Sequence, residues 1–123
     1  MPFVHTTDTV THEAHGARFT PLANPTLGSA DLCAWRVEIP ADTTGVPHTL
    51  NHEEVVIVLD GQIQFRLDDD KTTLNRGEAA VIPAGHVMSV DTHTALATIL
   101  ATTRVGIEGT FADGSSFTPP WSL

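Results

Sequence analysis

Apolar and polar residues alternate over several short stretches of this chain, and no stretch carries a helical repeat. In residues 34–39 and 62–67, every second side chain is large and apolar, and its neighbours are small or polar. Side chains of a β-strand point alternately to its two faces, so this period predicts strands with one buried and one solvated face. No segment repeats apolar residues at helical spacing over about ten positions, so we expect no substantial helix.

Further stretches are more continuously apolar and equally short. Residues 55–59, 79–82 and 96–103 are predicted to be strands. We expect a hairpin turn at Asp60-Gly61, because Gly tolerates the positive φ of such turns, and another turn at residues 68–71. Many short strands separated by Gly, Pro and Asp are typical of an all-β sandwich or barrel.

The run from Val55 to Leu59 is apolar at both strand parities. Both faces of that strand should therefore be covered. In a small barrel only one face looks inward, so the other face needs a second sheet or a second subunit. We expect a homodimer for this reason.

The chain of 123 residues is long enough for one domain with a core and too short for two ordinary ones. We predict a flexible N-terminal arm over residues 1–17 and one domain over residues 18–123. His12 and His15 lack the i, i+4 spacing of a helical zinc site, so we interpret them as part of a solvated arm. Trp121, which follows two prolines, is expected to pack onto the barrel.

Composition narrows the range of partners. The formal net charge is −9, and the six basic residues form no stripe, so we expect neither nucleic acid nor a membrane surface as a partner. No apolar run approaches the length of a membrane span. The polar N-terminus lacks the layout of a secretory signal, and Cys33 is the single cysteine, so the sequence predicts a cytoplasmic location.

Two segments carry the candidate chemistry. Residues 45–61 are GVPHTLNHEEVVIVLDG, and residues 77–88 are GEAAVIPAGHVM. Six residues separate Glu54 from Gly61, and five separate Gly77 from Pro83. In framework and spacing these segments resemble the two signature motifs of the cupin family. The resemblance covers roughly residues 19–121 and implies an all-β fold, a single double-stranded β-helix (jelly-roll) cupin barrel of the RmlC-like kind.

The same resemblance implies a metal site, because four ligands are usual in cupins: two His and a Glu in the first motif and one His in the second. His48 and Glu54 stand at ligand positions, but Leu50 and Met88 occupy the other two. The implied ligand set is therefore degenerate. Met88 adds a soft thioether, which would favour copper if it bound a metal.

His52 and His86 are candidate replacements for the lost ligands. Residues two apart on a strand share a face, so His52 groups with Glu54, and His86 with Met88, provided that no bulge intervenes. Imidazole and carboxylate suit iron, manganese, nickel, copper or zinc, and a catalytic ion needs about three protein ligands. The sequence leaves open a divalent transition metal and no metal at all.

Without a metal, the centre of the barrel becomes an apolar pocket. We expect Leu50, Met88, Phe65 and Trp35 to shape its wall. A carboxyl group buried there without a cation should have a raised pKa, so Glu54 would be a general acid or a hydrogen-bonded buried group.

Two functions follow. The first is a cupin that binds a small organic molecule in its barrel, as a metal-dependent enzyme of the dioxygenase or isomerase kind. The alternative is a metal-free cupin that binds or senses a ligand without catalysis. Function must be argued from the site and not from the fold, so the sequence leaves both open.

Overall fold

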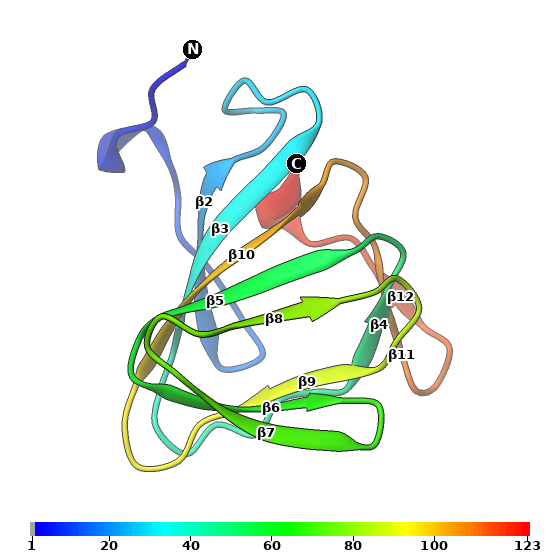
Figure 1. Ribbon diagram of the computed structural model, residues 1–123. Coiled ribbons are helices and arrows are strands. Elements are labelled where there is room, and N and C mark those ends of the chain that lie inside the picture. The colour runs from blue at the N-terminus through cyan, green and yellow to red at the C-terminus, as the bar shows by residue number, and fades with distance from the viewer. Residues whose placement is uncertain (1) are drawn as a thin grey trace.

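Two antiparallel sheets of six strands each face one another and enclose the core of the protein (Figure 1). This computed structural model describes residues 2–123. The first sheet has the order β1-β2-β3-β10-β5-β8, and the second has the order β12-β11-β4-β9-β6-β7. The strands are β1 (His12–Ala14), β2 (Ala17–Ala23), β3 (Leu32–Ile39), β4 (His48–Leu50), β5 (Glu54–Asp60), β6 (Gln62–Leu67), β7 (Asp70–Asn75), β8 (Ala79–Ile82), β9 (Met88–Asp91), β10 (Ala97–Arg104), β11 (Gly109–Phe111) and β12 (Ser116–Phe117).

The prediction of an all-β fold is confirmed. In residues 2–123 the helical elements are two 3-10 turns, η1 (Thr6–Asp8) and η2 (Pro120–Ser122). Neither turn, nor any other helix in the part of the chain described, has the length and apolar character that crossing a membrane requires. The expected strands at residues 34–39, 55–59, 62–67, 79–82 and 96–103 correspond to β3, β5, β6, β8 and β10.

The Asp60-Gly61 turn has a different role from the one expected. The sequence predicts a hairpin there, but β5 belongs to the first sheet and β6 to the second, so the chain changes sheets at this turn. Gly61 has φ +78°, and a Cβ on it would lie 2.7 Å from the carbonyl oxygen of Leu96. Gly is therefore required for both the backbone conformation and the close approach of the 96–97 backbone. Turn residues reveal the turn, but they do not reveal which sheet the next strand joins.

Strand β5 has one buried face and one partly covered face. Val56 and Val58 are each 1% exposed and point into the core, whereas Val55 and Ile57 on the other face are half-buried and Leu59 is 41% exposed. Each fully buried side chain of this size stabilises the fold by about 1.5–3 kcal/mol. Within one chain, the outer face of β5 lacks the complete cover that we expected.

Part of the expected N-terminal arm has regular structure. Residues 12–14 form β1, which pairs with β2 in register from His12 opposite Phe19 to Ala14 opposite Ala17. His15 and Gly16, at φ 51° and 77°, form the two-residue turn of this hairpin. Residues 2–8 extend away from the barrel in Figure 1. The flexibility of the arm in solution stays a prediction.

Candidate ligand-binding site

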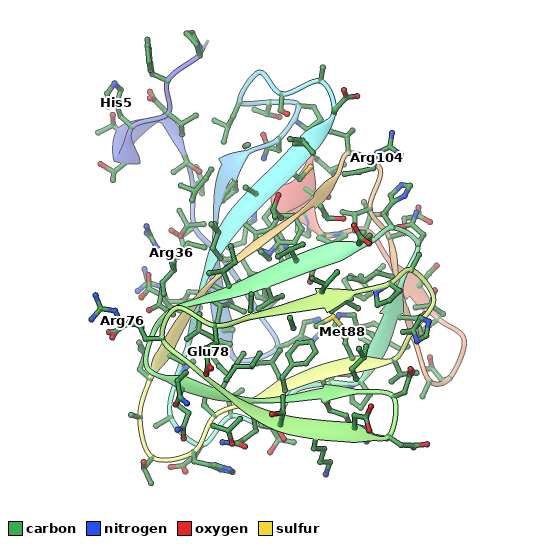
Figure 2. All side chains as sticks on the ribbon, viewed as in Figure 1. His5, Arg36, Arg76, Glu78, Met88 and Arg104 are labelled. Atoms are coloured by element: carbon green, nitrogen blue, oxygen red, sulfur yellow. The ribbon has the colours of Figure 1, made fainter. Side chains whose placement is uncertain are left out.

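A cavity of about 140 Å³ lies between the two sheets. Most of its wall is apolar, and it includes Trp35 on β3, Leu50 on β4, Val56 on β5 and Met88 on β9. Figure 2 shows Met88 in the interior, between the strands of the two sheets. The cavity is thus a largely hydrophobic chamber with few polar groups, which is the usual character of a small-molecule site.

Glu54 is the acidic side chain of this chamber. It is the first residue of β5, it is 6% exposed, and its carboxyl group has no hydrogen-bond partner among residues 2–123. Among the described residues, Nε1 of Trp121 is the one side-chain nitrogen or oxygen that is both fully solvent-inaccessible and without a hydrogen-bond partner. The carboxyl oxygens of Glu54 also have no partner, so they must still be accessible, and the cavity is the space that they face. Burial removes the hydration that stabilises the charged form and raises the pKa of Glu54 to about 8. Near neutral pH the group is therefore mostly a neutral acid with an O–H to donate.

His48 lines the same cavity from the opposite sheet. Its Nδ1 lies 2.8 Å from the carbonyl oxygen of Val46. A carbonyl can only accept, so Nδ1 carries the proton and Nε2 of the neutral ring is an acceptor. Burial lowers the pKa of His48, the hydrogen bond to Val46 opposes this effect, and the nearby His15 lowers the pKa further. The ring is thus neutral near neutral pH.

A stacked aromatic pair forms one part of the cavity wall. The ring centroids of Phe111 and Phe117 are 4.7 Å apart, and the rings of His48 and His15 approach both of them edge-on. Gly109 makes this arrangement possible, because a Cβ at that position would lie 2.2 Å from Cε1 of Phe117. His15, on the turn of the β1–β2 hairpin, is exposed and marks the mouth of the cavity.

A second aromatic group lies in the first sheet and the C-terminal turn. Trp121, in η2, stacks on Phe19 with ring centroids 3.8 Å apart and meets Trp35 edge-on at 6.3 Å. Trp121 is 5% exposed, which confirms that the chain end packs onto the barrel. The flat rings of the Phe111–Phe117 pair and of the Phe19–Trp121 pair line the cavity, and such walls are suited to a planar molecule.

The residues present do not fit a tightly bound metal ion. Within residues 2–123, no three His, Cys, Asp or Glu side chains are grouped so that they could hold one. His48 and Glu54 supply two donors, whereas Leu50 and Met88 fill the remaining positions with apolar volume and line the cavity. A bound ion needs about three protein ligands, so the donor set of this cavity is one short.

The structure does not bring His52 and His86 to the cavity. His52 lies in a bend between β4 and β5, and this bend breaks the two-residue alternation on which its grouping with Glu54 depended. His86 lies on the surface, where its Nδ1 is 2.6 Å from Oδ2 of Asp68. Its hydrogen bond is the main cause of the lowered pKa of Asp68. Neither histidine replaces a lost ligand in this arrangement.

Of the four residues expected to shape the pocket, three line the cavity: Leu50, Met88 and Trp35. Phe65 is buried at 3% exposure but lies outside the lining of this cavity, on β6. Sequence reasoning missed several other wall residues, among them His15, Phe111, Phe117 and Trp121. Residues 12–14, which precede His15, are too few to carry a strand period, so the local sequence gives no signal that this segment pairs with the barrel.

Two facing antiparallel sheets around an apolar cavity define a β-barrel whose interior has the character of a small-molecule site. A model of the cupin domain matches residues 35–99, which is more than half of the chain. The chain therefore belongs to the cupin domain family.

Solved structures share the fold at low sequence identity. An RmlC-like cupin from Shewanella frigidimarina has a TM-score of 0.74 at 16% identity, over 85% of this chain and 90% of that one. The polyketide cyclase RemF from Streptomyces resistomycificus has a TM-score of 0.76 at 21% identity, over 85% and 79%. The iron(II) protein HppE has a TM-score of 0.72 at 13% identity, over 84% and 60%. A comparison with curated protein sequences found no match. These likenesses confirm the jelly-roll fold and specify no activity.

Proposed function

We propose that this protein binds a small organic molecule in its barrel cavity without a resident metal ion. The observation that carries the proposal is the carboxyl group of Glu54, which is buried, unpaired among the described residues and accessible from an apolar cavity. A buried polar group without a partner costs about 1–3 kcal/mol, and a ligand that supplies the partner recovers that free energy on binding. The cavity thus carries an unmet hydrogen-bonding group that a ligand can satisfy.

Proton transfer is a second candidate function, because the cavity holds a group that can donate a proton and another that can accept one. Glu54 is neutral near neutral pH, with its pKa raised to about 8, and Nε2 of His48 is an unprotonated imidazole nitrogen. An acid and a base held on opposite sheets are the groups that an isomerase or a cyclase without a metal needs. RemF, which shares the fold, is a polyketide cyclase.

The metal-dependent dioxygenase or isomerase that the sequence resemblance implies is the competing function. It requires a third ligand beside His48 and Glu54. Met88 lies opposite His48 in the β4–β9 register and is the one further side chain with a soft donor atom there. A thioether favours copper over the other candidate metals.

Ligand binding is tested on protein stripped of metal by a chelator. A library of small organic molecules is screened by melting temperature, with wild type beside a Val46→Trp variant. Val46 lines the cavity and is 43% exposed, so a larger side chain there narrows the cavity without disturbing the core. We expect compounds that raise the melting temperature of wild type and leave Val46→Trp unaffected. Equal shifts in both proteins, or no shift with any compound, would contradict the proposal.

We also propose that the protein forms a homodimer through the outer face of its first sheet. Half-buried Val55 and Ile57, together with exposed Leu59 and Val81, share this face with Leu100 of the neighbouring strand. A second copy of the chain, placed on this stripe, would complete the cover of β5 that the sequence pattern predicts.

A further inference from the structure

We infer that the ligand of this cavity is built on a single six-membered ring, and that Phe117 limits the length of the side chain that this ring can carry. The inference rests on the proposed function and specifies the size class of the ligand and a residue that determines specificity. Three observations carry it: the volume of the cavity, the position of its mouth, and the place of the Phe117 ring over Gly109.

The interior of the cavity has room for one ring. Its volume is about 140 Å³, and most of its wall is apolar. An apolar cavity of about 150 Å³ in a protein interior binds a benzene-sized molecule. Leu50, Val56 and Ile99 in this wall are each at most 5% exposed, so the interior cannot widen without disturbing a close-packed core. A ligand larger than one ring must therefore extend toward the mouth.

The mouth of the cavity lies at the aromatic cluster that contains Phe111 and Phe117. Two of the residues that line the cavity are exposed to solvent, His15 and Val46. The ring of His15 meets Phe111 and Phe117 edge-on, at centroid distances of 5.8 Å and 6.1 Å. The carbonyl oxygen of Val46 accepts a hydrogen bond from His48, whose ring centroid lies 5.8 Å from that of Phe117. Both exposed positions therefore adjoin the ring of Phe117.

The absence of a side chain at Gly109 gives the Phe117 ring its place. Gly109 lies between Leu50 and Phe117 in the second sheet, because it is the register partner of both. A Cβ at this position would lie 2.2 Å from Cε1 and 2.4 Å from Cζ of Phe117, so the ring occupies the space that a side chain would fill. Aromatic residues cover glycines on neighbouring strands in this way. From this place the ring stacks on Phe111, with centroids 4.7 Å apart.

This arrangement makes the cavity selective for the length of the ligand. A ligand side chain that grows from the interior toward the mouth gains affinity with each CH₂ group that it buries. Once the chain reaches the stacked rings of Phe111 and Phe117, further growth forces a ring from its place or sends the chain into solvent. Phe117 is the ring whose place depends on a single backbone position, Gly109.

Para-alkylphenols measure this limit, because only the length of the chain changes along the series. Their hydroxyl group both donates and accepts hydrogen bonds, so it suits the carboxyl group of Glu54 in either protonation state. Binding of phenol, para-ethylphenol and para-butylphenol to metal-free protein is measured by calorimetry. We expect affinity to rise about fourfold per CH₂ group from phenol to para-ethylphenol. Para-butylphenol should bind at least about tenfold more weakly than para-ethylphenol.

Phe117→Ala removes the limiting ring. In this variant we expect affinity to keep rising through para-butylphenol, which should bind more tightly than para-ethylphenol. Ser116→Ala, at the exposed position of the same strand, is the matched control and should keep the wild-type order of affinities. If Phe117→Ala does not fold, Phe117→Leu replaces it, and we expect the preferred chain length to shift in the same direction.

Gly109→Ala tests the place of the ring separately. Gly109 has no positive φ, so the backbone accepts alanine and the conflict is with the Phe117 ring alone. We expect Gly109→Ala to change the ratio of the affinities for para-ethylphenol and para-butylphenol at least about threefold. The same substitution made in Phe117→Ala should leave this ratio unchanged, because the ring that alanine displaces is absent there.

Three results would overturn the inference: para-butylphenol binding tightest to wild type, the wild-type order of affinities persisting in Phe117→Ala, and an effect of Gly109→Ala that does not depend on Phe117. If the phenols do not bind but a library compound does, and Val46→Trp abolishes its binding, the proposed function stands and the size class is wrong. If neither the phenols nor any library compound binds, the proposed function fails as well.

Discussion

This cavity differs at two residues from the metal centre that the cupin resemblance implies. His48 and Glu54 remain at ligand positions, and the structure places both in the cavity wall. Leu50 and Met88, at the other two positions, are 5% and 4% exposed and fill space in the hydrophobic core. With apolar side chains at those two positions, burial raises the pKa of Glu54 to about 8, and the group is mostly a neutral acid near neutral pH.

The protonation of Glu54 makes stability depend on pH. Its pKa rises from 4.5 to about 8 on folding, so between these values the folded state holds a proton that the unfolded state has lost. The stabilisation is complete below about pH 4.5 and is lost as pH rises to about 8, at roughly 1.4 kcal/mol per pH unit at most.

Glu54→Gln removes this titration and keeps the shape of the side chain. We expect the free energy of unfolding of wild type to fall relative to Glu54→Gln as pH rises from about 5 to about 8. Denaturant unfolding of both proteins across that range measures the difference. A difference that stays constant with pH would show that Glu54 is not buried as a neutral acid.

Histidine at positions 50 and 88 would complete the usual cupin ligand set, so these substitutions test whether two missing ligands are what prevents metal binding. We expect the Leu50→His, Met88→His double variant to lose roughly 2–5 kcal/mol of stability per site without metal, because apolar core contacts are removed. Zinc or nickel should then raise its melting temperature, since four donors become available. A folded double variant that gains no stability from any divalent metal would show that His48 and Glu54 do not point to a common centre.

At this scale the sequence predicts part of the site. His48, Glu54, Leu50, Met88 and Trp35 follow from motif position and strand pattern, and all five line the cavity. The structure does not place His52 in the cavity lining, because a bend between β4 and β5 interrupts strand parity, and one-dimensional spacing does not reveal that bend.

Among the elements, the β1–β2 hairpin makes the largest unforeseen contribution. The spacing of His12 and His15 predicts a solvated arm, yet the hairpin carries His15 to the mouth of the cavity beside Phe111 and Phe117. These contacts join residues about 100 positions apart in the chain. Local periodicity therefore cannot identify them.

The hairpin also acts electrostatically on the site. His15 lowers the pKa of His48, so His15→Ala should raise the pKa of His48. Proton NMR of the His48 ring across pH measures the change, and His12→Ala serves as the matched control on the same hairpin. An unchanged His48 titration in His15→Ala, or an equal change in both variants, would contradict the placement of the hairpin turn beside His48.

The outer face of β5 and β8 carries the homodimer proposal. Val81 is 58% exposed on this face, and Val81→Glu should convert a dimer into a monomer because it buries a charge at the interface. Light scattering measures the mass. Leu123→Glu is the control, since Leu123 is equally exposed but lies at the chain end. A monomeric wild type, or a Val81→Glu variant that stays dimeric, would exclude this face as the interface.

For the whole molecule, hydrophobic patterning and two motifs are sufficient to predict a jelly-roll barrel. The alternation in residues 34–39 and 62–67 reappears in β3 and β6, where Trp35, Val37, Ile63 and Phe65 are each at most 4% exposed. The short strands β4, β11 and β12 are not predicted, because two or three residues carry no period. The homodimer and the cytoplasmic location stay predictions.

The central claim is that this cupin barrel holds an organic ligand and not a metal. Elemental analysis of protein purified without chelators tests it most directly, with the Leu50→His, Met88→His double variant analysed in parallel to show that the procedure retains a bound metal. We predict that wild type carries far less than one metal ion per chain and that iron, zinc, nickel and copper salts leave its melting temperature unchanged. One metal ion per chain in wild type, lost in His48→Ala, would contradict the claim.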